Sequence, residues 1–199
     1  MSRLIVAITG ASGAPYAVAT LARLLAAGSA VDLVVSAAAE RVARDELGDD
    51  WSPAALERRF GAGASAIRRH EPGDIGATIA SGSAPVDGMI VVPCSMGSAG
   101  RIAAGLSESL IERAADVQLK ERRPLVLVVR ETPLSVIHLE NLLRLAHAGA
   151  TVLPAAPGFY ARPREIADLL GFVAERAIAA AGIALKREVE WRGDGEGGR

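Results

Sequence analysis

The sequence is poor in cysteine, histidine and aromatic residues. Its 199 residues include one cysteine, Cys94, and three histidines, and only 4% are aromatic. A single cysteine excludes an internal disulfide framework, and three scattered histidines without paired spacing argue against a structural zinc site. Because this composition fits a reducing, intracellular compartment, we expect a cytoplasmic protein without a metal site.

The sequence also lacks a large net charge and long apolar runs, which limits the partners that the protein can bind. The 22 basic and 23 acidic residues nearly cancel, so no positive field extends over the chain to attract nucleic acid or anionic lipid. The apolar stretches, such as Leu4 to Ile8, are too short for a membrane span or for the core of a signal peptide. We therefore expect neither nucleic acid nor a membrane as a partner, and any anion site must be local.

The usual nucleotide-binding motifs are also missing. Residues 9–16 read TGASGAPY, which is neither the G-x-G-x-x-G of dinucleotide-binding proteins, nor G-x-x-x-x-G-K-S/T, nor the G-x-S-x-G of a nucleophile elbow. The second apolar run ends in Ser36 instead of an acid that would bind a ribose hydroxyl. A tight turn before a helix remains, and it favours a mononucleotide over a dinucleotide. Ser12 and Ser36 either contact a phosphate or flavin, or cap the helices behind them.

The apolar pattern that is present predicts one domain of the α/β class. Half of the residues are hydrophobic, which suffices for a substantial core. Short runs rich in β-branched residues recur at 3–9, 31–36, 88–93, 124–130 and 150–154, as in strands buried on both faces. Between them lie helical spacings, such as Val136, Leu139, Leu143 and Ala146 within 135–148. The alternation predicts a three-layer fold with a mostly parallel sheet, which binds ligands at the carboxyl ends of its strands.

Two segments depart from this alternation. Residues 48–87 are rich in glycine and predict an irregular excursion with one short helix near 53–60. From Gly182 onward the chain turns polar and glycine-rich. We therefore expect a single domain over residues 1–182 and a loosely ordered tail over residues 183–199, in which Trp191 is the one aromatic residue.

Three groups of polar residues are candidates for function. The loop from Pro93 to Ser98 combines hydroxyl residues with glycine after a buried strand, as a loop that lines a cofactor would. Within it, we assign Cys94 to burial and not to catalysis, because no histidine is near it in the sequence. Arg130 and Glu131 end an apolar strand, where parallel sheets place their chemistry.

The other candidates lie on predicted helices. Arg113 and Lys120 are seven residues apart and share a helix face. They either hold one phosphate or lie on a solvated face, where Glu112, Asp116 and Lys120 form an i, i+4 ladder that needs no ligand. Glu46, with its neighbour Asp45, lies near the carboxyl end of a helix, where the helix dipole disfavours acids. For these two acids, exposure is the simpler interpretation and a separate role is the alternative.

Together these motifs resemble the flavin prenyltransferase family, the UbiX-like proteins. The likeness rests on GASGA after the first strand, the Pro-Cys-Ser-x-Gly loop, ERAADVQLKERRPLVLVVRETPL, and IHLENLLRLAHAGATVLPAAPGFY with the following Arg-Pro. The resemblance implies a flavodoxin-like, Rossmann-type fold and a homododecamer with FMN near subunit interfaces. It implies metal-independent transfer of a dimethylallyl group from dimethylallyl phosphate to N5 and C6 of reduced FMN. The prenylated FMN then serves UbiD-like decarboxylases.

The resemblance also assigns individual residues by motif. The positions that it implies for FMN are Gly10, Ala11, Ser12, Ser36, Cys94, Ser95, Met96, Gly97 and Arg130. The positions that it implies for the dimethylallyl phosphate are Arg113, Lys120, Tyr160 and Arg176. Its catalytic positions are Ser12, Glu46, Lys120, Glu131 and Trp191.

Two departures and two alternatives accompany the resemblance. Glu108-Ser109 stands where the family often has Asp-Asn, and Ser98-Ala99-Gly100 replaces a bulkier stretch. The FMN-dependent cysteine decarboxylases share the fold, but this chain lacks their catalytic histidine after an early helix and their Pro-x-Met-Asn motif. A flavin carrier that binds FMN without turning it over is the alternative outside the enzymes.

Overall fold

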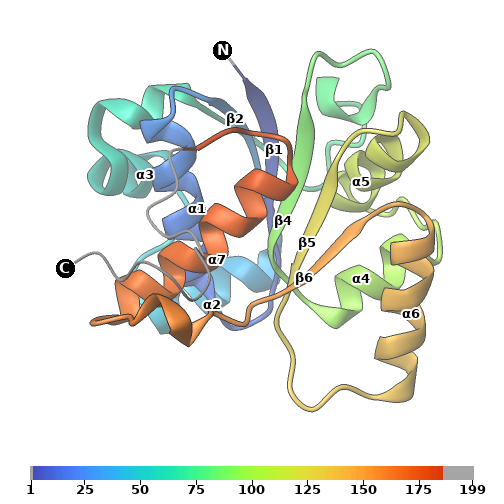
Figure 1. Cartoon of the computed structure of the whole chain (residues 1–199). Helices are drawn as coiled ribbons and strands as arrows, with labels where there is room; N and C mark the ends of the chain where they lie inside the picture. The colour runs from blue at the N-terminus through green and yellow to red at the C-terminus, as the bar shows by residue number, and fades with distance from the viewer. Residues whose placement is uncertain (1, 186–199) are drawn as a thin grey trace.

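The computed structural model describes residues 2–185 and contains one six-stranded sheet (Figure 1). The strands are β1 (Arg3–Ile8), β2 (Ala30–Val35), β3 (Ile67–His70), β4 (Gly88–Cys94), β5 (Leu125–Val129) and β6 (Thr151–Pro154). Every pair is parallel, and the strand order is β3-β2-β1-β4-β5-β6. The order reverses between β1 and β4, and sheets of this kind bind ligands at the carboxyl edge beside such a reversal.

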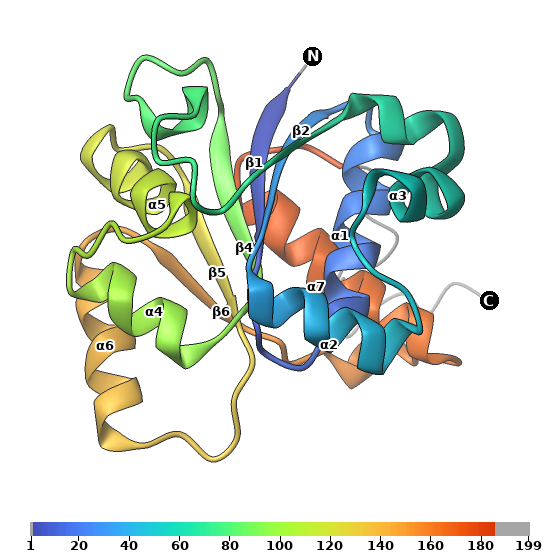
Figure 2. The same ribbon diagram turned by 180° about the vertical axis from the view of Figure 1, so that it is seen from behind.

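Helices cover both faces of this sheet. Figures 1 and 2 show one layer on each side. The first layer consists of α1 (Ala14–Ala26), α2 (Ala37–Leu47), α3 (Pro53–Phe60) and α7 (Ile166–Ala180). The second consists of α4 (Met96–Ala103), α5 (Leu110–Lys120) and α6 (Val136–His147). Three 3₁₀ turns complete the elements: η1 (Gly61–Ala66), η2 (Thr78–Ala80) and η3 (Phe159–Ala161).

The apolar strands divide the core in two. In β1, Leu4, Val6 and Ile8 point into the cluster shared with α1 and α7. Ile5 and Ala7 point into the cluster shared with α4, α5 and α6. Since successive side chains of a strand alternate between faces, both faces of β1 must be apolar, which explains its unbroken hydrophobic run. The predicted three-layer α/β fold and the parallel sheet are confirmed.

The five predicted strands and the helices at 53–60 and 135–148 are present. In α6, however, the apolar residues that indicate the helix are not the ones that it buries. Val136 is 70% exposed, Leu139 52% and Leu143 59%. The residues that α6 buries are Leu142 and Leu145. The spacing thus indicates a helix correctly, while most of its apolar residues lie outside the core of a single chain.

β3 is the strand that the apolar pattern did not predict. It is an edge strand within the glycine-rich excursion, and its sequence is Ile-Arg-Arg-His. Asp32 of β2, which is fully buried, lies 2.7 Å from Nε2 of His70 and accepts hydrogen bonds from Arg3 at 2.6 and 3.0 Å. Burial raises the pKa of Asp32, but the hydrogen bonds and charges of Arg3 and His70 outweigh it and hold the pKa below its ordinary value. The carboxylate therefore joins three neighbouring strands.

The described part of the chain reaches beyond the predicted domain end. Ile183 and Leu185 pack against the cluster of α1 and α7. The remaining residues of the predicted tail, including Trp191, lie outside the described residues. Among residues 2–185, no helix is both long and apolar enough to cross a membrane.

We predict that Asp32→Ala lowers the free energy of unfolding by about 3 kcal/mol at neutral pH, because it leaves Arg3 and His70 without their buried anion. The folded-state pKa of Asp32 is lowered, so its stabilising effect is complete above roughly pH 4 and is lost as the pH falls through the folded value. Urea unfolding at pH 7 and pH 3 measures both effects. The difference between wild type and variant should shrink at pH 3, and equal stabilities at pH 7 would contradict the prediction.

Candidate active site at the carboxyl edge of the sheet

Four of the predicted segments meet at the carboxyl edge, and Thr9 fixes two of them. Its hydroxyl donates to the carbonyl of Pro93 at 2.8 Å and accepts from the backbone N–H of Ser95 at 2.8 Å. Thr9 is buried, so water does not compete for these bonds. The loops after β1 and β4 are thereby held together at the point where the strand order reverses. This role could not be predicted from the sequence, because a threonine at the end of a strand is common.

Glu46 has a role that the exposure interpretation missed. Its carboxylate, at the end of α2, accepts hydrogen bonds from the backbone N–H groups of Gly13 and Ala14 at 2.8–3.1 Å, and one from the side chain of Ser12. Burial raises the pKa of Glu46, but these bonds and the charge of Arg130 hold it below its ordinary value. The amino end of α1 therefore already binds a carboxylate of the chain itself, through the N–H groups of Gly13 and Ala14.

Arg130 and Glu131 follow the end of β5 and have different partners. Strand β5 ends at Val129, and Nε of Arg130 donates to the carbonyl of Ser12 at 2.7 Å. Glu131 is exposed and accepts from the N–H of Thr132 at 3.0 Å. Glu131 is therefore not a buried counter-ion of Arg130. Its carboxylate instead remains open at the carboxyl edge, next to the residue that contacts the β1 loop.

Ser36 and Gly10 adjoin each other where α2 begins. Ser36 caps α2, because its hydroxyl accepts from the N–H of Ala39 at 3.2 Å. The capping interpretation thus holds for Ser36, whereas Ser12 caps no helix and bonds to Glu46. A Cβ on Gly10 would lie 2.4 Å from the Cβ of Ala38. Glycine is therefore required for the β1 loop to approach α2 this closely.

The loop after β4 presents only some of its predicted residues. Cys94 and Met96 pack in the core, and burial raises the pKa of the Cys94 thiol to about 12. A thiol with so high a pKa carries little thiolate at neutral pH, which agrees with the assignment of Cys94 to burial and not to catalysis. Ser95 is partly exposed and Gly97 is exposed. Ser95 also caps α4 by accepting from the N–H of Ser98 at 3.3 Å.

A groove of about 360 Å³ begins at this edge and runs between α2, α4 and α5. Ser36 and Ala37 line one side, and Ser98 and Arg101 line the other. Both family departures lie here, because Glu108 and Ser109 also line the groove. Arg101, which follows the small residues at 98–100, was not among the residues predicted from the sequence.

Tyr160 and Arg176 share a second pocket, of about 450 Å³, near the end of β6. The ring of Tyr160 packs edge-to-face on Phe172, with centroids 5.7 Å apart and an interplanar angle of 81°. These two predicted phosphate ligands are therefore brought together by the fold.

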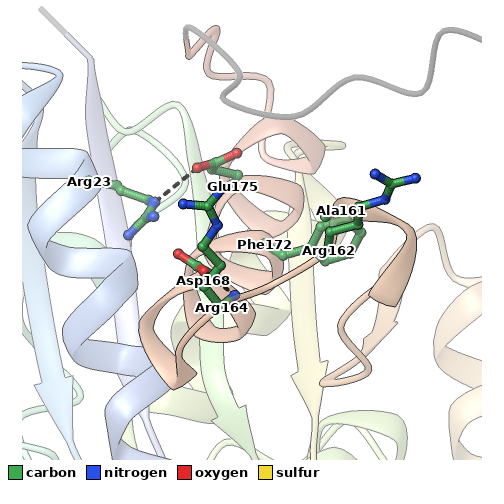
Figure 3. Close-up of a pocket in the computed structure, with 7 residues that line it drawn as sticks. All are labelled: Arg23, Ala161, Arg162, Arg164, Asp168, Phe172 and Glu175. Carbon is green, nitrogen blue, oxygen red and sulfur yellow. Dashed lines mark hydrogen bonds and ion pairs between the residues drawn. The ribbon is translucent and has the colours of Figure 1, made fainter. Parts of the chain in front are cut away.

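An adjacent pocket of about 300 Å³ shares Phe172 as a wall (Figure 3). It is bounded by an ion pair of 3.2 Å between Arg23 of α1 and Glu175 of α7. Arg164 and Asp168 lie near the start of α7, and Asp168 accepts from the backbone N–H of Arg164 at 2.7 Å. Arg23, Arg162 and Arg164 line this pocket, and none of the predicted site residues does.

Arg113 and Lys120 stand apart from the other predicted residues. Nε of Arg113 donates to the carbonyl of Ala80 at 3.1 Å, and Nζ of Lys120 would lie 2.7 Å from a Cβ on Gly82. Both cations thus face the turn at 80–82, which leads into the amino end of β4. Figure 1 shows α5 beside the half of the sheet where the strands begin. Within residues 2–185, no hydrogen bond or ion pair joins either cation to Ser12, Glu46 or Arg130.

The alternative charge ladder is not formed either. Asp116 pairs with Arg113 at 3.1 Å, Lys120 pairs with Glu121, and Glu112 pairs with Arg101 at 2.6 Å. Glu112 is 3% exposed, so it does not belong to a solvated face. In the part of the chain that the structure describes, no group of three or more His, Cys, Asp or Glu side chains is placed to hold a metal ion.

We predict that Glu46→Ala lowers the free energy of unfolding by about 1 kcal/mol, because two N–H groups of α1 lose their acceptor. Glu46→Gln should lose less, since an amide oxygen still accepts. Asp45 is the matched control: it lies in the same turn and makes no hydrogen bond or ion pair within residues 2–185. Urea unfolding of all three variants measures the effect. Equal losses in Asp45→Ala and Glu46→Ala would show that Glu46 does not cap α1.

Comparison with known proteins agrees with this geometry. A family model described as Flavoprotein matches residues 1–178. Flavin prenyltransferase UbiX of Streptomyces coelicolor is 45% identical over 98% of this chain and 97% of its own length.

Solved structures share the fold over nearly the whole chain. AnUbiX, in complex with FMN and dimethylallyl pyrophosphate, superposes with a TM-score of 0.84, at 39% identity over 96% of this chain and 98% of that one. A dodecameric FMN-dependent UbiX-like decarboxylase from Escherichia coli also gives 0.84, at 42% identity over 96% of this chain and all of the other. The chain therefore belongs to the Flavoprotein family and, within it, to the flavin prenyltransferases of the UbiX type.

Proposed function

We propose that this protein is a flavin prenyltransferase that joins a dimethylallyl group from dimethylallyl phosphate to N5 and C6 of reduced FMN. The observation that carries the proposal is 45% identity to a flavin prenyltransferase over nearly the full length of both chains. A structural neighbour that holds both FMN and dimethylallyl pyrophosphate supports the same pair of substrates. The product, prenylated FMN, would serve a UbiD-like decarboxylase, a recipient that follows from the family relationship.

The residues at the carboxyl edge fit a flavin mononucleotide. Gly10 lets the β1 loop approach α2, where the first turn begins with Ser36 and leads into the groove. The first N–H groups of a helix lack partners within it and favour an anion such as a phosphate. No acid ends β2, so a second ribose has no partner there. Bound FMN supplies the N5 and C6 atoms that receive the dimethylallyl group.

The chain's own residues can orient that flavin and manage its protons. Because the Ser12 side chain is hydrogen-bonded to the charged Glu46, its hydroxyl oxygen keeps acceptor capacity for a flavin N–H. Arg130 holds the carbonyl of Ser12 and thereby the turn in which it lies. Glu46 has a lowered pKa, so it serves as a fixed acceptor and not as an acid. The open carboxylate of Glu131 is the better candidate to relay protons.

The phosphate of the donor needs cations as it leaves. Arg113, Lys120 and Arg176 supply that charge in this proposal, with the Tyr160 hydroxyl as a further donor, where other enzymes use a divalent metal. Tyr160 and Arg176 share one pocket, but Arg113 and Lys120 lie on α5 and face the turn at 80–82, which precedes the amino end of β4. One chain therefore holds two parts of a phosphate site that it does not join.

Assembly into a homododecamer would complete the site. An apolar patch formed by Leu134, Val136, Ile137, Leu139 and Leu143 is exposed by 40–70% around α6, and such a patch marks a protein–protein interface. The structural neighbour from Escherichia coli is dodecameric. In a heterologous interface, two different surface patches meet, one from each of the two copies. The α5 cations of one copy can thus reach the FMN site of another.

We predict that the purified protein, incubated with reduced FMN and dimethylallyl phosphate, converts FMN to a flavin heavier by one dimethylallyl group. Mass spectrometry of the extracted flavin measures the product, with dimethylallyl pyrophosphate as a parallel donor. The yield should be the same with EDTA, because arginine and lysine neutralise the phosphate. Tight FMN binding without any product would favour a flavin carrier. Loss of product in EDTA that Mg²⁺ restores would contradict the role of the cations.

We predict that Glu131→Gln and Arg113→Ala are each slowed at least about tenfold, but complement each other when expressed together. If copies mix at random, about a quarter of the sites combine an intact carboxyl edge from one copy with an intact α5 from another. Turnover of the co-expressed pair should therefore recover toward a quarter of the wild-type rate. The doubly substituted chain, Glu131→Gln with Arg113→Ala, is the control and should not recover. No recovery in the mixture would place the whole site in one copy.

A further inference from the structure

Arg101 is a charged residue of the groove to which the family resemblance assigns no role. It lies in the last turn of α4 and lines the groove together with Ser36, Ala37 and Ser98. Its Nε donates to Oε1 of Glu112 at 2.6 Å, and its Nη2 donates to the hydroxyl of Ser98 at 3.2 Å. The guanidinium thus donates to acceptors on two helices, Ser98 of α4 and Glu112 of α5, and these two bonds fix its plane at the groove wall.

Glu112 is built into the core to hold this arginine. It is 3% exposed, and its other oxygen, Oε2, accepts from the N–H of Ser109 at 2.7 Å. Burial raises the pKa of Glu112, but the bonds from Ser109 and Arg101 outweigh it and keep the carboxylate ionised. A buried carboxylate is stable only with such partners. Arg101 is thus positioned by a buried charge, although Glu112 also lines the groove, with both of its oxygens already accepting hydrogen bonds from Arg101 and Ser109.

Some N–H donors of the Arg101 guanidinium are not used within residues 2–185. Of its five N–H groups, those on Nη1 make no hydrogen bond or ion pair within residues 2–185. Nη1 would lie 3.6 Å from a Cβ on Gly97, so it is beside the loop that the family resemblance assigns to FMN. One carboxylate can orient a guanidinium while the remaining donors bind a second anion.

We infer that Arg101 binds the phosphate of FMN, as an additional cofactor residue held in place by Glu112. The inference rests on the proposed function. Phosphate is the one charged group of oxidised FMN, and the forked donors of arginine match its oxygens. The amino end of α2 lies at the groove, and the positive end of its helix dipole attracts the same anion. Glu108 also lines the groove, but its carboxylate is exposed and its repulsion is screened by water and salt.

Comparison of two flavins tests this role, because riboflavin is FMN without the phosphate. Arg101→Met should weaken FMN binding by about tenfold or more and leave riboflavin binding within about twofold, as expected for loss of a charge-assisted contact. Fluorescence titration of both oxidised flavins measures the two dissociation constants. Arg58→Met removes the same charge from an exposed position of α3 and should change neither constant.

The single substitution also leaves Glu112 unpaired, so the double variant Arg101→Met with Glu112→Gln removes the buried charge as well. Its melting temperature should recover relative to Arg101→Met, while its preference for FMN stays lost. A preference for FMN that survives in either folded variant would overturn the inference. If the stable double variant lost affinity for FMN and riboflavin equally, the inference would also be overturned, because Arg101 would then not contact the phosphate. A wild-type protein that binds neither flavin would overturn the proposed function itself.

Discussion

The hydroxyl of Thr9 is the contact on which the arrangement of the site depends. It links two loops whose residues are 84 positions apart in the sequence, one after β1 and one after β4. Hydrogen bonds in a buried position have no water to replace them, so this link fixes the loops more firmly than an exposed one would. Ser12 and Ser95 lie in the two loops that Thr9 holds together. The strand order reverses at the same point, between β1 and β4.

Three carboxylates extend this rigidity outward from these loops. Asp32 joins β1, β2 and the edge strand β3, Glu46 joins α2 to the amino end of α1, and Glu112 joins α5 to α4. In each case burial raises the pKa, and nearby donors lower it further than burial raises it. All three therefore remain charged at neutral pH and act as fixed acceptors. In the proposed reaction, proton transfer therefore falls to a different group, and Glu131 is a predicted site residue with an exposed carboxylate.

The division of the predicted phosphate ligands explains an otherwise unfavourable surface. α6 exposes Val136, Leu139 and Leu143, which a monomer would gain by burying. The same chain keeps Arg113 and Lys120 on α5, on the same side of the sheet and facing the turn at 80–82. Both features make sense if neighbouring copies cover the apolar residues and supply the missing cations. Assembly and catalysis would then depend on the same contacts.

The sequence by itself determined the fold class, the five apolar strands and most of the residues at the carboxyl edge. Those features depend on local patterns, such as unbroken β-branched runs and small residues after each strand. Only the tertiary structure decided that Glu46 caps α1, that β3 joins the sheet edge, that Glu131 is open, and that Arg113 lies far from Ser12. These depend on contacts between segments distant in the sequence, and a pattern of neighbouring residues carries no record of such contacts. The side chain of Arg101 shows the difference most clearly, because its direction is set by the buried Glu112 from another helix.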